Sequence, residues 1–421
     1  VTVCPTKAIE MKPQESQAAQ QAAFDYCVEN IRKKDNIPGV VSEVSVKGSQ
    51  FNQPLLEFSG SCAGCAETSY ARLITQLFGE KMFISNATGC SSIWGGTASI
   101  SPYTTNKESG HGPAWINSLF EDNAEHGLGM QIGYETVRAN LITKVEALKG
   151  KNAELDAVID KFLETKNNTK ANDEPAKALI AELEKAAAAG CEKSAEILKS
   201  KQYIAKKSVW IFGGDGWAYD IGFGGLDHVL ASGRDVNVLV VDTEVYSNTG
   251  GQSSKATPIG AVAQFAAGGK PTVKKDLGML AMSYGYIYVA QVALGADPNQ
   301  LIKALKEAEA YKGPSLIIAY APCINHGISK GMANAQLEAK LAVQAGYWHL
   351  YRFNPDLKKE GKNPFILDSK EPTLDFNEFL MGEVRYASLV RTFPETAEVL
   401  LKEAAENAKD KYASYKKLAE A

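Results

Sequence analysis

The sequence has no apolar run that reaches the ~20 residues needed to cross a bilayer, and its start lacks both the basic end and the apolar core of a secretion signal. We therefore expect a cytoplasmic protein that does not bind membranes. An excess of positive charge is also lacking, since the net charge is −4, the pI is about 5.9 and the 45 Lys and Arg residues are spread along the chain. A nucleic-acid surface would gather basic residues into a stripe, so we expect small molecules or mildly charged proteins as partners.

Cysteine is scarce, and the seven cysteines are an odd number in a chain of 421 residues. This does not fit the paired disulfide framework of a small secreted domain, and it favours reduced thiols or metal ligands. An initiator Met is missing too, because the chain opens directly on VTVCP. We expect the sequence to be a piece of a longer polypeptide.

From Ser208 onward, apolar β-branched segments alternate with helical ones. Such continuous apolar runs are typical of strands buried on both faces, and the alternation predicts parallel βαβ units. The expected fold class is α/β, with a doubly wound, mostly parallel sheet. We expect a linker over 14–60, the main domain over 61–330 and a C-terminal tail region over 331–421. A stretch rich in Ala, Glu and Lys predicts a helical insertion at about 135–205.

Two polar strand ends predict a phosphate and magnesium site. The strand VWIF runs into GGDGW, which holds Asp215, and 28 positions further the strand VLVVD runs into TEVYSNTGGQ. Glycines allow a backbone to approach a phosphate, and Mg²⁺ prefers oxygen ligands that it shares with a diphosphate. Asp215 with the Thr243 hydroxyl and the Val245 carbonyl would form such an oxygen set. Ligands of doubly wound sheets bind at the carboxyl ends of the strands, where these residues lie.

Four cysteines lie in turn-rich loops. Cys62 and Cys65 form a CxxC in GSCAGCAET, Cys90 follows in ATGCSSIWGG, and Cys323 ends a strand in YAPCINHG. Four thiolates satisfy the count for one tetrahedral-sulfur site, and from the count alone zinc and iron are equal candidates. By contrast, Cys27 and Cys191 lie alone in helical segments and are expected to be structural.

The combination of motifs resembles the C-terminal portion of pyruvate:ferredoxin (flavodoxin) oxidoreductase. The segment DTEVYSNTGGQSS is typical of this family, whereas many other thiamine-diphosphate enzymes carry two asparagines where Asp242 and Thr243 stand. The three cysteine loops resemble those that hold the family's buried [4Fe–4S] cluster. The opening Cys4-Pro5 resembles the end of a two-cluster ferredoxin domain, which would occupy residues 1–13, with Cys4 bound to a further [4Fe–4S] cluster.

The resemblance implies a thiamine-diphosphate-binding fold and an oxidoreductase. Pyruvate and coenzyme A would give acetyl-CoA and CO₂, with electrons passed through [4Fe–4S] clusters to ferredoxin or flavodoxin. Magnesium would be held by Asp215, Thr243 and Val245, and one cluster by Cys62, Cys65, Cys90 and Cys323. Asn248 would reach the reacting carbon, and the thiamine diphosphate would be lined by Glu67, Cys90, Gly214, Asp215, Gly216, Trp217, Thr243, Glu244, Val245, Tyr246, Ser247 and Asn248.

We expect the rest of the same enzyme as a partner, because neither a carboxylate that activates thiamine nor a cationic clamp for the substrate is evident in this chain. A homodimer is also expected. His326 is left without a role. Three alternatives stay open: an oxidoreductase for another 2-oxoacid, a non-redox thiamine-diphosphate decarboxylase or synthase, and an electron-transfer module that carries a cluster beside a degenerate cofactor site.

Overall fold

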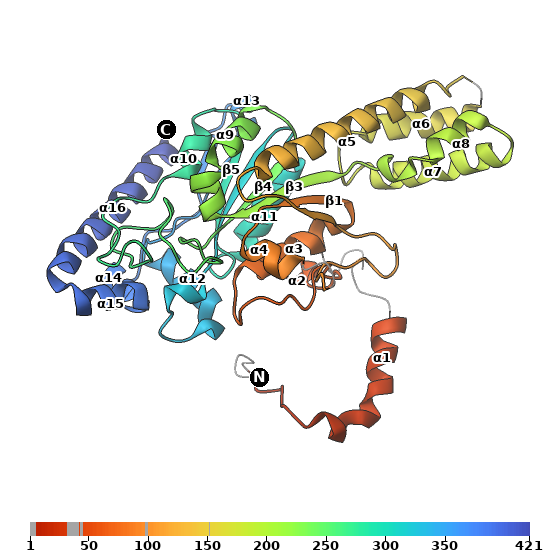
Figure 1. The fold of residues 1–421 in the computed structure, drawn as a ribbon. Coiled ribbons are helices and arrows are strands. Elements are labelled where there is room, and N and C mark those ends of the chain that lie inside the picture. The colour runs from red at the N-terminus through yellow and green to blue at the C-terminus, as the bar shows by residue number, and fades with distance from the viewer. Residues whose placement is uncertain (1–5, 32–41, 43–44, 97–99, 151) are drawn as a thin grey trace.

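The computed structural model describes residues 6–31, 42, 45–96, 100–150 and 152–421. Their centre is one eight-stranded sheet in the order β2-β1-β3-β4-β6-β5-β7-β8. Neighbouring strands are parallel, except that β7 runs antiparallel to both β5 and β8. The expected mostly parallel sheet is confirmed (Figure 1). The strands are β1 Met82–Asn86, β2 Ala114–Asn117, β3 Ser208–Gly214, β4 Asn237–Asp242, β5 Tyr288–Val292, β6 Ser315–Tyr320, β7 Tyr351–Phe353 and β8 Phe365–Leu367.

Helices cover both faces of the sheet. Successive strand residues point to opposite faces, so each strand contributes side chains to two separate cores. In β3, Val209 and Ile211 join one core cluster, whereas Trp210 and Phe212 join the other. Buried residues of α3 and α11 complete the second cluster, and those of α9, α10, α12, α14 and α16 complete the first. These helices are α3 Glu67–Phe78, α11 Pro298–Ala310, α9 Phe223–Ala231, α10 Leu277–Met282, α12 Ala335–Gln344, α14 Phe376–Met381 and α16 Pro394–Glu420.

The predicted helical insertion forms an arm that projects from the sheet (Figure 1). The first part of α5 packs on β1 and β3, and its second part continues into the arm. The arm has a core of its own around Leu141, Ile159, Phe162 and Leu179. At its base, Lys81 donates a hydrogen bond of 2.7 Å to the carbonyl of Thr169. The arm consists of α5 Asn123–Glu146, α6 Ala153–Thr165, α7 Asp173–Ala188 and α8 Glu192–Leu198.

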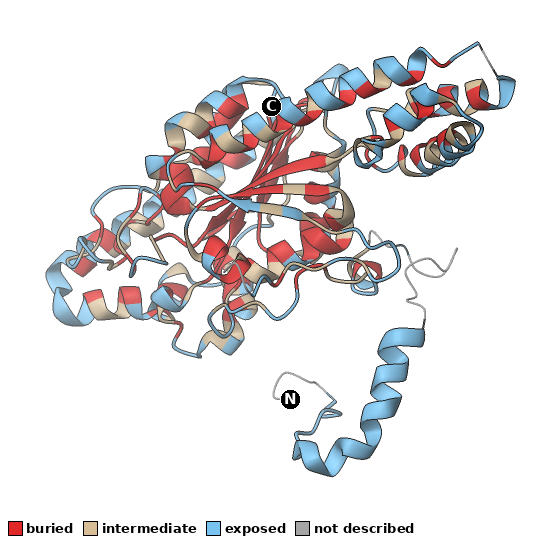
Figure 2. Ribbon diagram, turned by 45° about the vertical axis from the view of Figure 1, so that its right-hand side comes forward, coloured by how far each residue is buried: buried red, intermediate tan, exposed pale blue. Residues whose placement is uncertain are grey.

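Residues 331–421, expected as a tail region, are part of the main body. They add β7 and β8 to the sheet and place α16 across its edge (Figure 1). At the other end, α1 has no buried residue and stands away from the sheet (Figure 2). Cys4 lies outside the described residues, and residues 6–13 form no helix or strand. The remaining helices are α1 Gln21–Asn30, α2 Val46–Ser49, α4 Cys90–Gly95, α13 Asp356–Lys359 and α15 Val384–Thr392.

Within the described part of the chain, no helix combines the length and the apolar character that a membrane span requires.

Candidate functional site

The predicted site residues gather at the carboxyl edge of the sheet. Asp215 directly follows β3, Thr243 directly follows β4, and Cys323 lies three positions after β6. These three strands are hydrogen-bonded neighbours, with Gly214 paired to Val241 and Asp242 paired to Tyr320. Their ends therefore open on one place.

Three oxygen atoms converge at the ends of β3 and β4. The Thr243 hydroxyl lies 2.9 Å from Asp215 Oδ1 and 3.0 Å from the carbonyl oxygen of Val245. A hydroxyl has one proton, so it can donate to only one of these two acceptors. When Asp215 is ionised, the second acceptor is left beside another oxygen without a hydrogen between them. A cation would satisfy this arrangement, and the three atoms are those predicted to bind magnesium.

The Asp215 carboxylate is buried and forms no ion pair with any residue that the structure describes. It accepts hydrogen bonds from the Thr243 N–H, at 3.1 Å, and from the Ser254 hydroxyl, at 2.7 Å. Burial, and then the nearby carboxylate of Asp242, raise the pKa of Asp215 to about 8, although the Ser254 hydroxyl, the charge of Lys274 and the Thr243 hydroxyl oppose the rise. A bound divalent cation would supply the missing positive charge.

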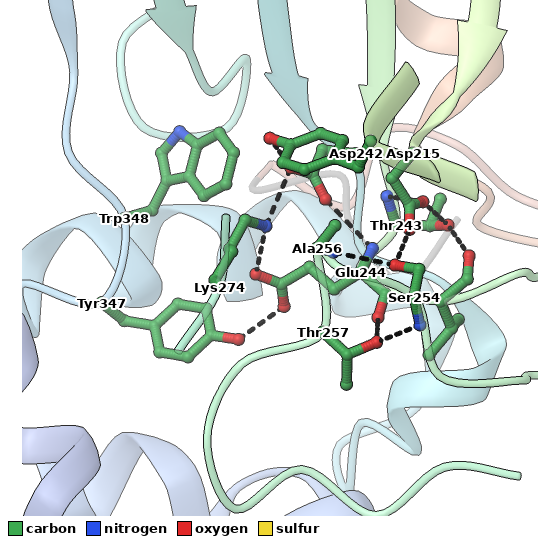
Figure 3. A network of polar contacts seen from close by, with 12 residues as sticks. Asp215, Asp242, Thr243, Glu244, Ser254, Ala256, Thr257, Lys274, Tyr347 and Trp348 are labelled. Carbon is green, nitrogen blue, oxygen red and sulfur yellow. Dashed lines mark hydrogen bonds and ion pairs between the residues drawn. The ribbon is translucent and has the colours of Figure 1, made fainter. Parts of the chain in front are cut away.

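Glu244 points away from these oxygens and into the protein (Figure 3). Its carboxylate binds Lys274 at 3.0 Å, the Tyr347 hydroxyl at 2.5 Å and Arg385 at 2.7 Å. Burial opposes its ionisation, but Lys274 and Arg385 hold the pKa of Glu244 down to about 2. Lys274 also pairs with Asp242 at 2.8 Å. Glu244 can therefore line a cofactor only through its main chain.

The other segments predicted to line the cofactor differ in exposure. Trp217 is fully buried in the core, so only its main chain is available. A Cβ on Gly216 would come within 2.5 Å of the Tyr246 ring, which explains why glycine is needed there. Asn248 is exposed. Gly214 is open, since the nearest atom to a Cβ there would be 3.9 Å away.

The four loop cysteines lie near one another. Burial, and then the charge of Glu67, raise the pKa of Cys65 and of Cys90 to about 12, and Cys323 adds to both shifts. Burial raises the pKa of Cys323 to about 11, with smaller contributions from Glu67 and Cys62. Cys27 on α1 and Cys191 at the start of α8 belong to other parts of the molecule.

No three His, Cys, Asp or Glu side chains among the described residues are close enough to hold a single metal ion.

The loops that carry Cys90 and Cys323 contact the Thr243–Asn248 loop. Cys90 Sγ lies 3.3 Å from the Ser247 hydroxyl and 4.0 Å from Asn248 Oδ1. The Asn325 amide lies 3.4 Å from the carbonyl of Ser247 and 3.7 Å from Cys323 Sγ. A group bound by the cysteines would therefore border a cofactor bound at Asp215.

Glu67, predicted to contact the cofactor, is buried at the start of α3, two residues after Cys65. Its carboxylate accepts a hydrogen bond of 2.8 Å from the Trp94 indole. Burial raises the pKa of Glu67 to about 7, and the Trp94 hydrogen bond partly opposes the shift. Close to neutral pH this carboxyl can therefore hold or release a proton.

His326, which the sequence left without a role, lies in the loop that follows Cys323 and bonds the loop that carries Thr243. Its Nε2 lies 2.7 Å from the carbonyl oxygen of Thr243, so Nε2 carries the hydrogen and donates. Its Nδ1 lies 3.5 Å from the carboxylate of Glu383. Lys274 and Arg385 were not predicted, because nothing in their local sequence marks them as site residues. Ser254 was given no role, although it ends the DTEVYSNTGGQSS motif.

Comparison with known proteins gives one matching family model and several similar proteins. Residues 182–319 match the model of the C-terminal TPP-binding domain of thiamine pyrophosphate enzymes. Pyruvate-flavodoxin oxidoreductase of Enterobacter agglomerans is 56% identical over 99% of this chain and 36% of its own length. Pyruvate:ferredoxin oxidoreductase of Moorella thermoacetica is 57% identical over 99% of this chain and 36% of its own length.

The mitochondrial pyruvate dehydrogenase (NADP(+)) of Euglena gracilis is 47% identical over 100% of this chain and 23% of its own length. The chain thus spans about a third, or less, of the curated relatives it matches. Over nearly its whole length it resembles pyruvate:ferredoxin and pyruvate-flavodoxin oxidoreductases, which confirms the resemblance predicted from the motifs.

Proposed function

We propose that this chain is the cofactor-binding C-terminal part of a pyruvate:ferredoxin (flavodoxin) oxidoreductase. The complete enzyme would convert pyruvate and coenzyme A to acetyl-CoA and CO₂ and pass two electrons to ferredoxin or flavodoxin. The observation that carries the proposal is a contact between loops: Cys90 touches Ser247, which lies in the loop that also carries Thr243 and Val245. A non-redox thiamine enzyme would have no use for cysteines at that place.

Magnesium would be held by the Asp215 carboxylate, the Thr243 hydroxyl and the Val245 carbonyl, which already converge. Ser254 and the Thr243 N–H orient the Asp215 carboxylate through hydrogen bonds to its two oxygens. The open backbone at Gly214 leaves room for a diphosphate. Thiamine diphosphate, when bound, would supply the carbon centre that accepts the electron pair left by departing CO₂.

Cys62, Cys65, Cys90 and Cys323 would bind one [4Fe–4S] cluster as thiolates, since a metal deprotonates the thiols that it binds. Asn248 is exposed next to Cys90, where its amide can orient a substrate carbonyl or carboxylate. We expect the carboxylate that activates thiamine, and the cationic clamp for pyruvate, to come from the rest of the enzyme. Ligation of an outer [4Fe–4S] cluster by Cys4, a homodimeric state and a cytoplasmic location remain predictions from the sequence.

Calorimetric titration of the anaerobically purified protein with thiamine diphosphate tests the cofactor site. We expect magnesium-dependent binding in the wild type and its loss in Asp215→Ala, because the diphosphate charge would then lack its cation. The control is Asp227→Ala, which removes a partly exposed carboxylate on α9 that accepts a hydrogen bond from the Tyr284 hydroxyl. Equal magnesium-dependent affinity in wild type and Asp215→Ala would contradict the proposed site. In the complete enzyme, failure to reduce ferredoxin or flavodoxin with pyruvate and coenzyme A would refute the proposed activity.

A further inference from the structure

The start of α15, near the C-terminus, contacts the loop that carries Cys323. The N–H of Val384 donates to the carbonyl of Gly327 at 2.9 Å, and the N–H of Ser329 donates to the carbonyl of Gly382 at 2.9 Å. Gly327 has φ of 67°, and a Cβ there would lie 2.6 Å from Val384 Cβ. Only glycine permits this close approach. The two segments therefore hold each other at a defined distance.

Side chains from the same place reach the loop that carries Thr243. Arg385 Nη2 binds the Glu244 carboxylate at 2.7 Å, while its Nε binds Glu383 at 2.7 Å. Glu383 faces His326, whose other ring nitrogen donates to the carbonyl of Thr243. The Arg385 side chain is 2% exposed, and those of Glu244 and Glu383 are 1% and 0% exposed. Such completely buried ion pairs exclude water and fix the geometry of the groups they join.

The backbone of Glu244 explains why the loop needs this anchor. Glu244 has φ of 62°, a left-handed conformation that non-glycine residues rarely adopt. It stands between Thr243 and Val245, and this turn brings the Val245 carbonyl back to within 3.0 Å of the Thr243 hydroxyl. A conformation of this kind persists only where its surroundings enforce it. Arg385 and Lys274, which grip the Glu244 carboxylate, provide that enforcement.

We propose that Arg385, oriented by Glu383, is a positioning residue for the magnesium site, so that the C-terminal segment 331–421 completes that site. Arg385 does not contact the three oxygen ligands. It acts through Glu244, whose conformation directs the Val245 carbonyl toward Asp215 and Thr243. The inference rests on the proposed function, because it concerns the magnesium-dependent binding of thiamine diphosphate.

The test measures thiamine-diphosphate affinity against magnesium concentration in the anaerobically purified protein. We expect Arg385→Gln to weaken magnesium-dependent binding about 10- to 100-fold, as is typical when a group that orients a metal ligand is lost. Arg385→Lys retains the positive charge but lacks the guanidinium fork that bonds both Glu244 and Glu383. Its affinity for thiamine diphosphate should therefore lie between those of the wild type and Arg385→Gln. The matched control is Arg352→Gln, since Arg352 on β7 is equally buried and paired with Glu307 and Asp368.

Both Gln variants should lower the melting temperature, because each leaves carboxylates without their buried cation. Only Arg385→Gln should raise the magnesium concentration needed for binding. Equal magnesium requirements in Arg385→Gln and Arg352→Gln would overturn the inference while leaving the proposed function intact. If Arg385→Gln does not fold, Glu244→Gln gives the same decision, since it keeps the shape of the side chain and removes the charge that Arg385 grips. Absence of binding in the wild type would instead refute the proposed function itself.

Discussion

His349 should make the docking of the C-terminal helix sensitive to acid. This residue, just before β7, is 3% exposed and packs against two tyrosines of α16, with ring centroids 5.6 Å from Tyr412 and 5.6 Å from Tyr415. Burial, and then the positive charge of Lys411, lower the pKa of His349 from 6.5 to about 3, while Asp276 acts in the opposite direction. The folded protein therefore keeps this imidazole neutral at any pH above about 3.

The sign and size of the effect follow from proton linkage. Below pH 6.5 the unfolded chain takes up a proton on His349 that the folded chain does not, so stability is lost as pH falls through 6.5 toward 3. Each pH unit in this window costs about 1.4 kcal/mol. Between pH 7.5 and pH 5 the loss amounts to about 2 kcal/mol. Above pH 7.5 this residue adds no further pH dependence.

Thermal unfolding of the wild type and of His349→Gln, measured from pH 7.5 to pH 5, tests this reasoning. The glutamine side chain is neutral throughout, so the variant should start less stable at pH 7.5 and lose about 2 kcal/mol less on acidification. Hydrogen exchange in α16 should show the same difference, because the α16 tyrosines pack on His349. His228→Gln, in which an exposed histidine of α9 is replaced, should retain the wild-type pH profile. Parallel profiles for wild type and His349→Gln would refute the argument.

Two further predictions concern the cluster and the packing of α5. Anaerobic Cys→Ser variants should fall into two groups, since loss of a ligand lowers iron content but loss of a structural thiol does not; full iron in two or more of the first group would contradict the ligand set. Gly127→Ala should destabilise the protein by about 1–3 kcal/mol, because the new Cβ would lie 2.4 Å from Ile211 Cγ1. Gly133→Ala, on an exposed position of the same helix with no neighbour within 4 Å, should instead stabilise by up to about 1 kcal/mol, and melting curves that shift alike would refute the packing argument. The two cysteine groups are Cys62, Cys65, Cys90 and Cys323 against Cys27 and Cys191.

Much of the sheet and its polar edge is predictable from the sequence. Runs such as VWIF and VLVVD have few alternatives to buried parallel strands, and parallel strands bring their carboxyl ends to one edge. This is why the convergence of Asp215, Thr243 and Val245 follows from two local patterns, GGDG and DTEV. The arm is equally predictable, since its sequence is rich in Ala, Glu and Lys, which favour helices.

The support of that edge is not predictable in the same way. Arg385 and Glu244 are 141 positions apart, and an arginine at the start of a helix is ordinarily solvated. β7 and β8 have three residues each, too few for a period-two pattern, so 331–421 read as a tail region. Glu244 was expected to line the cofactor because it stands inside a motif, but its left-handed backbone turns its side chain toward Lys274.

The buried carboxylates around the proposed magnesium site differ in whether a lysine or arginine pairs with them. Around the ends of β3 and β4 the structure buries four carboxylates, those of Asp215, Asp242, Glu244 and Glu383. Lys274 bonds Asp242 and Glu244, and Arg385 bonds Glu244 and Glu383, so three of the four have a cation. Asp215 receives hydrogen bonds only from hydroxyl and amide groups, and burial of an unpaired carboxylate favours its protonated form. A diphosphate that arrived alone would add negative charge next to this uncompensated acid. Under the proposed function, magnesium would balance the charge of an ionised Asp215 as well as that of the diphosphate, because the other three carboxylates already have a cation.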